Sequence, residues 1–471
     1  MLKTWLAGLA LALVLFAGNA PGSAVASQDV SIPMDDGISL AATLYLPDGT
    51  PPAGGWPAIV FLHGLGGNRE EMNALAQAYG FVGQGYAVLT FDARGHGDSG
   101  GLVSIDGPRE IADVKEVEAW LAARPDVADS KIGAWGISYG GGAVLDSLAA
   151  GVPWSAVATA ETWSDLYSAL VPQGLLKSGL VAALAGSIPE QRKSPDLIQI
   201  QALAFSGKDP AAVKAWADAR SSIARLGAVT TPVFLAQGRR DFLFDIDQGV
   251  RAYDALRGPK VLYVGLDGHP PSTFPAADTG LLMSQVRAWF DCYLRAIGCD
   301  TKPTGVEVAP ESYAGSTVAF KALPKTKTTT VVFPGVSTFA RKGKAVRTTS
   351  RLTRPLEIFG SPTVTVPLAA SGGWSRLVAV LVARTPGGKQ IVVSAGGVPT
   401  RKGARKVAIR LFDQATYLPK GARLTLTLGS SSLAQSPSNL LYLDLPMAAT
   451  ARARVGNAVV TIPGLRTPIT R

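Results

Sequence analysis

Two short stretches of the sequence fit the pattern G-x-S-x-G, in which a serine hydroxyl held on a sharp turn can act as a nucleophile. The stretch GDSGG places Ser99 at its centre, and the stretch GISYG places Ser138 there. A single active site needs one nucleophile, so the elements around each serine must decide between them.

A nucleophilic serine of this kind is preceded by a strand and followed by a helix, because the strained turn between them lifts the hydroxyl above the sheet. The sequence predicts a buried strand over 131–137 and a helix over 139–150, on either side of Ser138. Ser99 instead lies in a glycine-rich loop that no predicted helix follows. GDSGG also spells the nucleophile segment of trypsin-like proteases, but the alternating strands and helices described below exclude their two-barrel β fold. We therefore expect Ser138 to be the nucleophile.

A serine nucleophile needs a general base, and the chain contains three histidines, His63, His96 and His269. In doubly wound hydrolases the chain order is nucleophile, acid, histidine. Only His269 follows Ser138, and it comes shortly after a strand predicted over 260–266. His269 is therefore the expected base. His63 is expected to shape its own loop, and His96 to pack or hydrogen-bond within its own.

The acid that orients this histidine is expected on the loop after the strand predicted over 232–238. That loop carries Asp241, Asp245 and Asp247, and Asp267 lies nearer to the histidine. Asp241 comes soonest after its strand, so it is the expected acid, and Asp245 is the next candidate.

Two backbone N–H groups are expected to stabilise the oxyanion of a tetrahedral intermediate. One belongs to Tyr139, the residue after the nucleophile. The other belongs to Leu65, in the loop HGLGG at 63–67, where glycines let the backbone approach closely.

The elements that must position these groups alternate between strand and helix from residue 27 to residue 302. Buried apolar runs such as PAIVFLHG and YAVLTFD are separated by helical patterns, which predicts a doubly wound, mostly parallel sheet. The alternation breaks over about 162–228, where several helices rich in Ala and Leu predict a cap inserted over the ends of the strands. We therefore expect an α/β catalytic domain with a helical cap.

Residues 303–471 have a different composition, in which Val- and Thr-rich runs separated by Gly and Pro predict an all-β sandwich. This region holds 23 Lys and Arg against 5 Asp and Glu, a net charge of +18, whereas residues 1–302 carry −8. A basic domain outside the cell suggests binding to anionic cell-envelope polymers or lipid headgroups. The alternative is a solvated basic surface. We find no nucleic-acid-binding motif in the sequence.

Residues 1–26 have the layout of a secretory signal peptide, with Lys3, a following apolar run and small residues that end at Ala26. The apolar run is too short to span a membrane as a helix. We therefore expect cleavage after Ala26 and a secreted, extracytoplasmic protein.

Export favours a disulfide between the two cysteines, Cys292 and Cys299. A continuous helix would hold their Cα atoms too far apart for a bridge. The expected disulfide therefore requires the last helix of the catalytic domain, over about 278–297, to end before Cys299, and Gly298 is a natural stop.

The motifs HGLGG, DARGHGDSGG, GISYGG, GRRD and DGHPPS occur in the order and contexts of α/β-hydrolases. The β-rich tail, with LTRPLEIFGSPTVTVPLAAS near its start, is similar to the C-terminal jelly-roll of the X-Pro dipeptidyl-peptidase and cocaine-esterase family. The resemblance implies a serine hydrolase in which a cap and a jelly-roll flank the active site, with Ser138, Asp241 and His269 as the triad. Several relatives use a tyrosine hydroxyl as the second oxyanion donor, on the loop that corresponds to 63–67, where this chain has HGLGG.

The expected activity is cleavage of an acyl ester or amide through an acyl-enzyme, with no cofactor and no metal ion. A dipeptidyl-peptidase must bind a free amino terminus, and Glu161 and Asp165 are the acids placed where the cap begins. Because the cap is rich in Leu and Ala, an esterase acting on an apolar group is favoured, with Glu161 and Trp163 as the expected substrate-binding residues. The alternatives are an X-Pro dipeptidyl-peptidase, an acyltransferase acting on an envelope alcohol, and an envelope-binding protein with incidental hydrolysis.

The charge count predicts that the isolated region from residue 303 binds anionic liposomes or wall polymer at low salt and releases them as salt rises, because ions screen its charges. Co-sedimentation over a series of salt concentrations measures this release. Absence of binding at low salt would leave only the solvated-surface interpretation.

Overall fold

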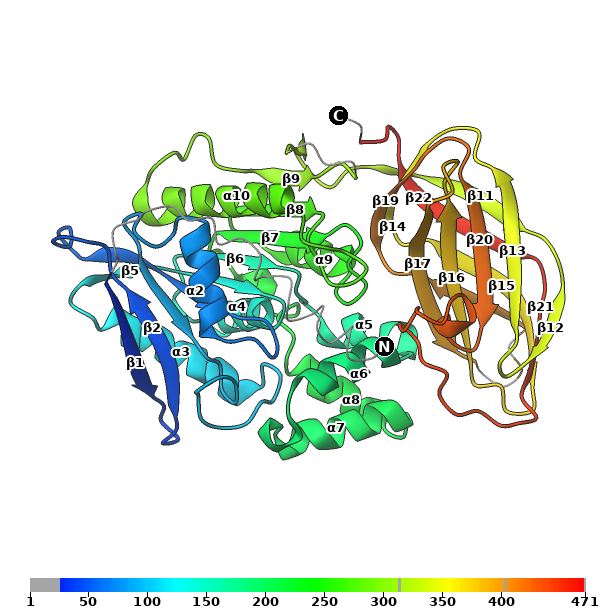
Figure 1. The fold of residues 1–471 in the computed structure, drawn as a ribbon, viewed down its shortest axis with the longest axis horizontal. Helices are drawn as coiled ribbons and strands as arrows, with labels where there is room; N and C mark the ends of the chain where they lie inside the picture. The colour runs from blue at the N-terminus through cyan, green and yellow to red at the C-terminus, as the bar shows by residue number, and fades with distance from the viewer. Residues whose placement is uncertain (1–25, 312–314, 401–402, 404, 470–471) are drawn as a thin grey trace.

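The structure is a computed structural model that describes residues 26–311, 315–400, 403 and 405–469 (Figure 1). The expected signal peptide, residues 1–26, therefore lies outside the described residues except for its last residue. In the described part of the chain, no helix is both long and apolar enough to cross a membrane.

Ten strands form the sheet of the catalytic domain, in the order β1-β2-β4-β3-β5-β6-β7-β8-β9-β10. Neighbouring strands from β4 to β9 run parallel, and antiparallel pairs stand at both edges. The predicted doubly wound, mostly parallel sheet is confirmed. Its strands are β1 (Ser27–Pro33), β2 (Ser39–Tyr45), β3 (Trp56–Leu62), β4 (Ala87–Phe91), β5 (Val127–Ile137), β6 (Ala156–Ala160), β7 (Val233–Gly238), β8 (Lys260–Gly265), β9 (Gly305–Val308) and β10 (Val318–Phe320).

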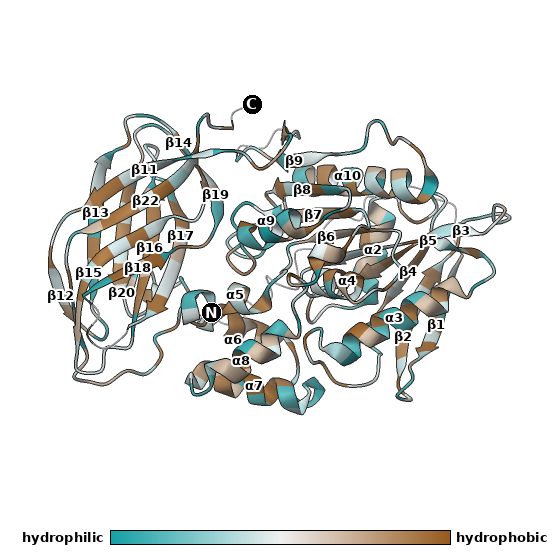
Figure 2. Ribbon diagram, turned by 180° about the vertical axis from the view of Figure 1, so that it is seen from behind, coloured by the Kyte–Doolittle hydropathy of each residue, from teal (hydrophilic) through white to brown (hydrophobic). Residues whose placement is uncertain are grey.

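Helices cover both faces of this sheet, because its central strands are hydrophobic along their whole length (Figure 2). Apolar side chains of α2 and α10 pack against one face, and those of α3, α4 and α9 pack against the other. The side chain of Asn68 accepts hydrogen bonds from two backbone N–H groups and begins the first of these helices. The helices are α2 (Arg69–Ala78), α3 (Pro108–Ala122), α4 (Tyr139–Ala149), α9 (Ile246–Ala255) and α10 (Ala276–Arg295).

The end of α10 brings the two cysteines together. Ala296 adopts a left-handed conformation with φ of 57° and ends the helix, two residues before the expected stop at Gly298. The Cα atoms of Cys292 and Cys299 then lie 4.7 Å apart, and their sulfur atoms are bonded. The predicted disulfide is confirmed.

Four helices between β6 and β7 form the cap, within the range 162–228 that the sequence predicts. They lie beside the carboxyl ends of the strands and next to the second domain (Figure 1). These helices are α5 (Leu166–Leu170), α6 (Ser178–Ser187), α7 (Pro195–Ser206) and α8 (Pro210–Asp218), with short 3₁₀ turns at Pro172–Gly174, Glu190–Arg192 and Leu226–Ala228.

The second domain consists of two antiparallel sheets, one with eight strands and one with four, around a shared apolar core. The separate all-β domain predicted from the sequence is thus present. Its strands are β11 (Thr326–Phe333), β12 (Ser337–Ala340), β13 (Lys344–Arg351), β14 (Leu356–Gly360), β15 (Thr363–Ser371), β16 (Arg376–Arg384), β17 (Gln390–Pro399), β18 (Lys406–Arg410), β19 (Gln414–Leu418), β20 (Arg423–Gly429), β21 (Arg452–Val455) and β22 (Ala458–Leu465).

The boundary expected between residues 302 and 303 is wrong by two strands. β9 pairs in parallel with β8 and β10 pairs with β9, so both belong to the catalytic sheet. The edge of β8 offers unpaired backbone groups, which β9 satisfies, and β10 in turn pairs with the edge of β9. The sandwich itself begins with β11, at Thr326.

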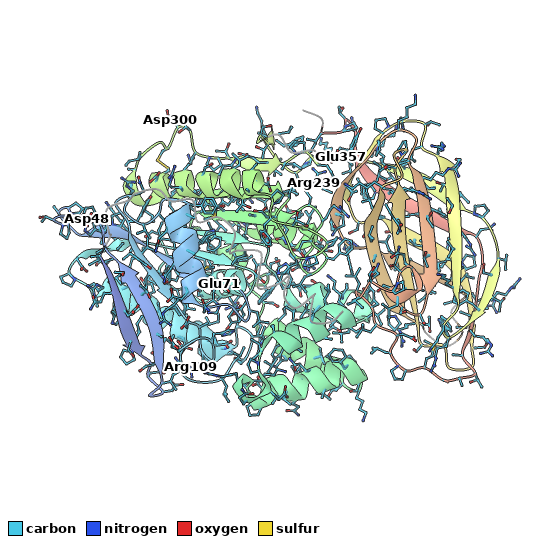
Figure 3. All side chains as sticks on the ribbon, viewed as in Figure 1. Asp48, Glu71, Arg109, Arg239, Asp300 and Glu357 are labelled. Atoms are coloured by element: carbon cyan, nitrogen blue, oxygen red, sulfur yellow. A yellow bond between two sulfur atoms is a disulfide. The ribbon has the colours of Figure 1, made fainter. Side chains whose placement is uncertain are left out.

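Backbone hydrogen bonds and one buried ion pair join the two domains at the segment that follows β7. The N–H of Ala415 on β19 donates to the carbonyl oxygen of Arg239 at 2.8 Å. The Arg239 side chain is 1% exposed and forms an ion pair with Glu357 on β14, and both residues are labelled in Figure 3. Burial raises the pKa of Glu357, and the charge of Arg239 opposes that rise.

Replacing Glu357 by leucine should lower the free energy of unfolding by about 3 kcal/mol, because it removes the nearer carboxylate from a buried guanidinium and leaves only Glu311, 3.7 Å away, to oppose its charge. The double variant Arg239→Met/Glu357→Leu removes both charges and is expected to be more stable than Glu357→Leu alone. Urea unfolding at pH 7, followed by circular dichroism, measures both. A double variant no more stable than the single one would contradict the pairing.

Candidate active site

Ser138 lies on the sharp turn between β5 and α4, with φ of 54° and ψ of −115°. A residue other than glycine rarely adopts a positive φ, so the surrounding packing must hold this turn. A Cβ atom on Gly136 would lie 2.2 Å from the carbonyl oxygen of Gly140, and one on Gly140 would lie 2.2 Å from that of Leu62. Only glycine fits at these two positions, which explains the residues of GISYG on either side of the serine.

The side chains of Ser138, His269 and Asp241 form one hydrogen-bonded chain. Oγ of Ser138 lies 2.9 Å from Nε2 of His269, and Nδ1 of His269 lies 2.7 Å from Oδ2 of Asp241. The Asp241 carboxylate also accepts three backbone N–H groups, from Leu243 and Phe244 at Oδ1 and from His269 at Oδ2. These donors fix the carboxylate, which can in turn hold the imidazole in the tautomer whose Nε2 accepts the serine proton.

The other acids considered from the sequence have different partners. Asp245 accepts the N–H of Asp413, in the sandwich, at 2.9 Å. Asp267 accepts the hydroxyl of Thr279 at 3.0 Å. The acid that the structure places on His269 is therefore the one that comes soonest after its strand.

Ser99, the competing serine, is 2% exposed and its hydroxyl is already used. It donates to the carbonyl oxygen of Asp92 at 2.6 Å and accepts the N–H of Ala41 at 2.9 Å. Ser99 therefore holds the glycine-rich loop against β2.

The two histidines before the turn are buried. Nδ1 of His63 donates to the carbonyl oxygen of Gly64 at 2.8 Å, and its Nε2 accepts the N–H of Ala93 at 3.0 Å. Burial lowers the pKa of both rings, that of His96 to about 3. Both rings are therefore neutral at pH 7, and His63 shapes the loop that follows β3.

The expected oxyanion donors lie beside Ser138. Tyr139 is the first residue of α4, so its N–H is one of the groups that a helix leaves unpaired. A Cβ atom on Gly64 would lie 3.8 Å from Cβ of Ser138, which places the loop that carries Leu65 next to the nucleophile. Leu65 and Tyr139 both line the cavity that opens at Ser138.

That cavity, called the cap cavity below, has a volume of about 900 Å³ with its open mouth included. Its walls are the cap helices, the start of α4 and the loops after β3, β4, β6 and β7. Trp163, Leu166, Leu184, Trp216 and Phe244 are among the large side chains that line it. No Asp, Glu, Lys or Arg stands among its lining residues in the described part of the chain.

Of the two expected substrate-binding residues, Trp163 lines the cap cavity and Glu161 does not. The N–H of Glu161 still bonds to the carbonyl oxygen of Ala236 on β7, which keeps this residue in the sheet and out of the cap. Glu161 is 3% exposed, and burial raises the pKa of its carboxyl group well above the usual range. The expectation for Glu161 as a residue of the substrate pocket is therefore wrong.

Asp165, the other acid considered at the start of the cap, is engaged as well. Its carboxylate pairs with Arg251 at 2.8 Å and accepts the N–H of Ser168 at 3.0 Å, which caps α5. Asp165 therefore stabilises the helix start.

Glu161, Asp241 and His269 place possible ligand atoms within 4.8 Å of one another, which is close enough to hold a metal ion. Both ring nitrogens of His269 already have partners, however, Nδ1 in Asp241 and Nε2 in Ser138. The arrangement thus suits proton transfer better than metal binding.

Lys177 is a residue of this site that sequence reasoning missed. Its Nζ donates to the carbonyl oxygens of Phe242 and Leu243, each at 2.9 Å, and lies 4.1 Å from the ring centre of Phe412. Burial lowers the pKa of Lys177 to about 8, although the nearby charge of Asp245 opposes this. The sequence could have indicated this residue, because Lys177 is the one charged residue within the apolar stretch LYSALVPQGLLKSGLVAALAG.

Comparisons with known proteins agree with this architecture. Residues 36–270 match the family model described as X-Pro dipeptidyl-peptidase (S15 family). The crystal structure of a CocE/NonD family hydrolase from Staphylococcus aureus superposes with a TM-score of 0.72 at 14% identity, covering 96% of this chain and 99% of that one. An alpha-amino acid ester hydrolase superposes with a TM-score of 0.65 at 17% identity, over 95% of this chain and 98% of that one. At these identities the two structures show the fold.

A curated relative matches over a shorter stretch. The quorum-quenching protein AidA of Acinetobacter baumannii (strain MDR-ZJ06) is 38% identical over 131 residues, which are 26% of this chain and 40% of that protein. Matches to other curated relatives cover between 13% and 47% of their length. The chain thus spans less than half of the curated relatives it matches here.

A fluorophosphonate probe should label the wild-type protein and Ser99→Ala but not Ser138→Ala, because only a serine activated by a base and oxyanion donors reacts with it. Gel fluorescence measures labelling, and circular dichroism confirms folding. Persistent labelling of folded Ser138→Ala would refute the assignment.

His269→Ala should lose about 10³-fold or more in kcat with the fold intact.

Proposed function

We propose that this chain, which belongs to the X-Pro dipeptidyl-peptidase (S15) family and is a serine hydrolase, is an exported esterase that cleaves esters with an apolar acyl group. The observation that carries the proposal is the cap cavity, which opens at Ser138 and is lined by apolar side chains. Burial of an acyl chain there would contribute about 0.8 kcal/mol for each CH₂ group removed from water.

The proposed mechanism uses an acyl-enzyme. His269 takes the proton of Ser138 as its Oγ attacks the ester carbon, and Asp241 stabilises the imidazolium. The backbone N–H groups of Tyr139 and Leu65 would stabilise the tetrahedral oxyanion. The alcohol leaves with the proton from His269, and a water molecule, activated by the same base, releases the acid.

The peptidase alternative needs a carboxylate for the free amino terminus of the substrate, because a buried ammonium group without a partner is costly. Neither acid at the start of the cap supplies one. Glu161 lies outside the cap cavity with its pKa raised well above the usual range, and Asp165 pairs with Arg251. The apolar cavity therefore supports the esterase over the dipeptidyl-peptidase.

Export is part of the proposal and rests on two observations. The first 26 residues have the pattern of a signal peptide. The bond between Cys292 and Cys299 is also typical of proteins that work in an oxidising compartment outside the cytoplasm.

The proposal predicts that p-nitrophenyl butyrate has a higher kcat/KM than Gly-Pro-p-nitroanilide. Because esters are intrinsically more reactive than anilides, butyryl-p-nitroanilide is the matched control, and it should be cleaved at least as fast as the Gly-Pro anilide. Release of the chromophore on one enzyme preparation gives all three values, whose ratios report differential binding of the transition states. A higher value for the Gly-Pro anilide than for butyryl-p-nitroanilide would establish the peptidase instead.

A further inference from the structure

A second cavity reaches the triad from the side of the β-sandwich, and it is called the sandwich cavity here. It has a volume of about 1420 Å³ with its open mouth included, and it is lined by His269 and Phe242 and by residues of the loop 435–443. Nε2 of His269 bonds to Oγ of Ser138, which lines the cap cavity. The two cavities therefore meet at the residues that would carry out the chemistry.

Helix α6 forms the wall between the two cavities. Val181 lines the cap cavity, Leu180 lines the sandwich cavity, and Leu184 lines both. An amphipathic helix on a protein surface has one polar face, whereas α6 is apolar nearly all round. The presence of a cavity on each side accounts for this pattern.

The loop 435–443 of the sandwich is fixed against the start of α6. The N–H of Gly179 donates to the carbonyl oxygen of Leu441 at 3.1 Å, and a Cβ atom on Gly179 would lie 1.2 Å from the carbonyl oxygen of Leu440. The hydroxyl of Ser178 accepts the N–H of Leu443 at 2.9 Å. These contacts fix the loop 435–443, which forms one wall of the sandwich cavity, relative to the triad.

That wall presents uncharged hydrogen-bonding groups among apolar side chains such as Val392, Leu440 and Leu441. The sandwich contributes amide and hydroxyl side chains to the cavity, namely Gln390, Gln435, Ser436, Ser438 and Asn439. Nδ2 of Asn439 donates to Oε1 of Gln435 at 3.2 Å, while its Oδ1 is buried without a hydrogen-bond partner. The amides and hydroxyls of this wall can both donate and accept hydrogen bonds, as a ligand hydroxyl does.

We infer that the sandwich cavity binds the alcohol half of the ester, and that this alcohol is an uncharged polyol such as glycerol or a sugar. The inference deepens the proposed esterase function and rests on it. Amide groups offer both a donor and an acceptor, which is what a hydroxyl group requires. A charged alcohol would lose its hydration without an opposite charge, because the described residues that line this cavity include no Asp, Glu, Lys or Arg.

The acyl half and the alcohol half of the substrate then lie in different cavities, with the ester bond that breaks between them. Ser138 Oγ bonds to the acyl carbon, whose chain lies in the cap cavity. The bond from that carbon to the alcohol oxygen breaks, and the oxygen takes the proton that His269 accepted from Ser138. The polyol departs through the sandwich cavity, and water enters to hydrolyse the acyl-enzyme.

The test compares octanoyl esters of three alcohols, namely ethanol, glycerol and glucose, with the full-length mature protein. The wild-type kcat/KM for the glycerol and glucose esters should exceed that for ethyl octanoate by about 10-fold or more, since a site built to hydrogen-bond a hydroxyl disfavours an alcohol that lacks it. Asn439→Leu should lower this ratio about 10-fold. Gln84→Leu is the matched control, because Gln84 is an exposed amide that lines neither cavity, and it should keep the wild-type ratio.

The outcomes separate the two proposals. No hydrolysis of any octanoyl ester by the folded protein overturns the esterase itself. Good hydrolysis of ethyl octanoate with no preference for the polyol esters overturns only the assignment of the sandwich cavity. Should Asn439→Leu fail to fold, the wild-type protein alone tests the inference. Added glycerol should capture the octanoyl-enzyme more efficiently than added propanol. Equal capture by the two alcohols overturns the inference.

Discussion

The acid of the candidate triad is held in place by both domains at once. The side-chain amide of Gln414, on β19 of the sandwich, donates to the backbone carbonyl oxygen of Asp241 at 2.9 Å. Arg239, which is buried and lies two residues before this aspartate, forms an ion pair with Glu357 of the sandwich. From the cap, Lys177 binds the carbonyl oxygens of the two residues after Asp241. The geometry at His269 therefore depends on contacts made outside the α/β sheet.

The same arrangement divides the surroundings of Ser138 into two different environments. On one side the cap offers an apolar cavity. On the other, amide and hydroxyl side chains of the sandwich stand among the apolar residues of a second cavity, with α6 between the two. The strained turn at Ser138 exposes its hydroxyl at the point where these environments meet. An ester has the same division, since an acyl chain is apolar and a polyol is not, and the proposed substrate class follows from that match.

Much of the catalytic domain could be predicted from the sequence, because strand-turn-helix chemistry is local. Ser138 was distinguished from Ser99 by its neighbouring elements, and His269 and Asp241 by their order along the chain. The position of Glu161 could not be predicted, because its burial depends on pairing with β7, which is distant in sequence. The pairing of β9 and β10 with the catalytic sheet could not be predicted for the same reason, because a short strand can pair with any sheet edge that is open to it. The contact of Lys177 with the loop after β7 likewise depends on tertiary packing.

A crystal structure of the protein after reaction with a p-nitrophenyl ester of octylphosphonic acid tests the central claim most directly. The account predicts phosphorus bonded to Oγ of Ser138, a phosphonyl oxygen within hydrogen-bonding distance of the N–H groups of Leu65 and Tyr139, and the octyl chain among the cap helices. Density for the chain in the sandwich cavity would contradict the division of the substrate. A phosphonate on any other residue would contradict the assignment of the nucleophile.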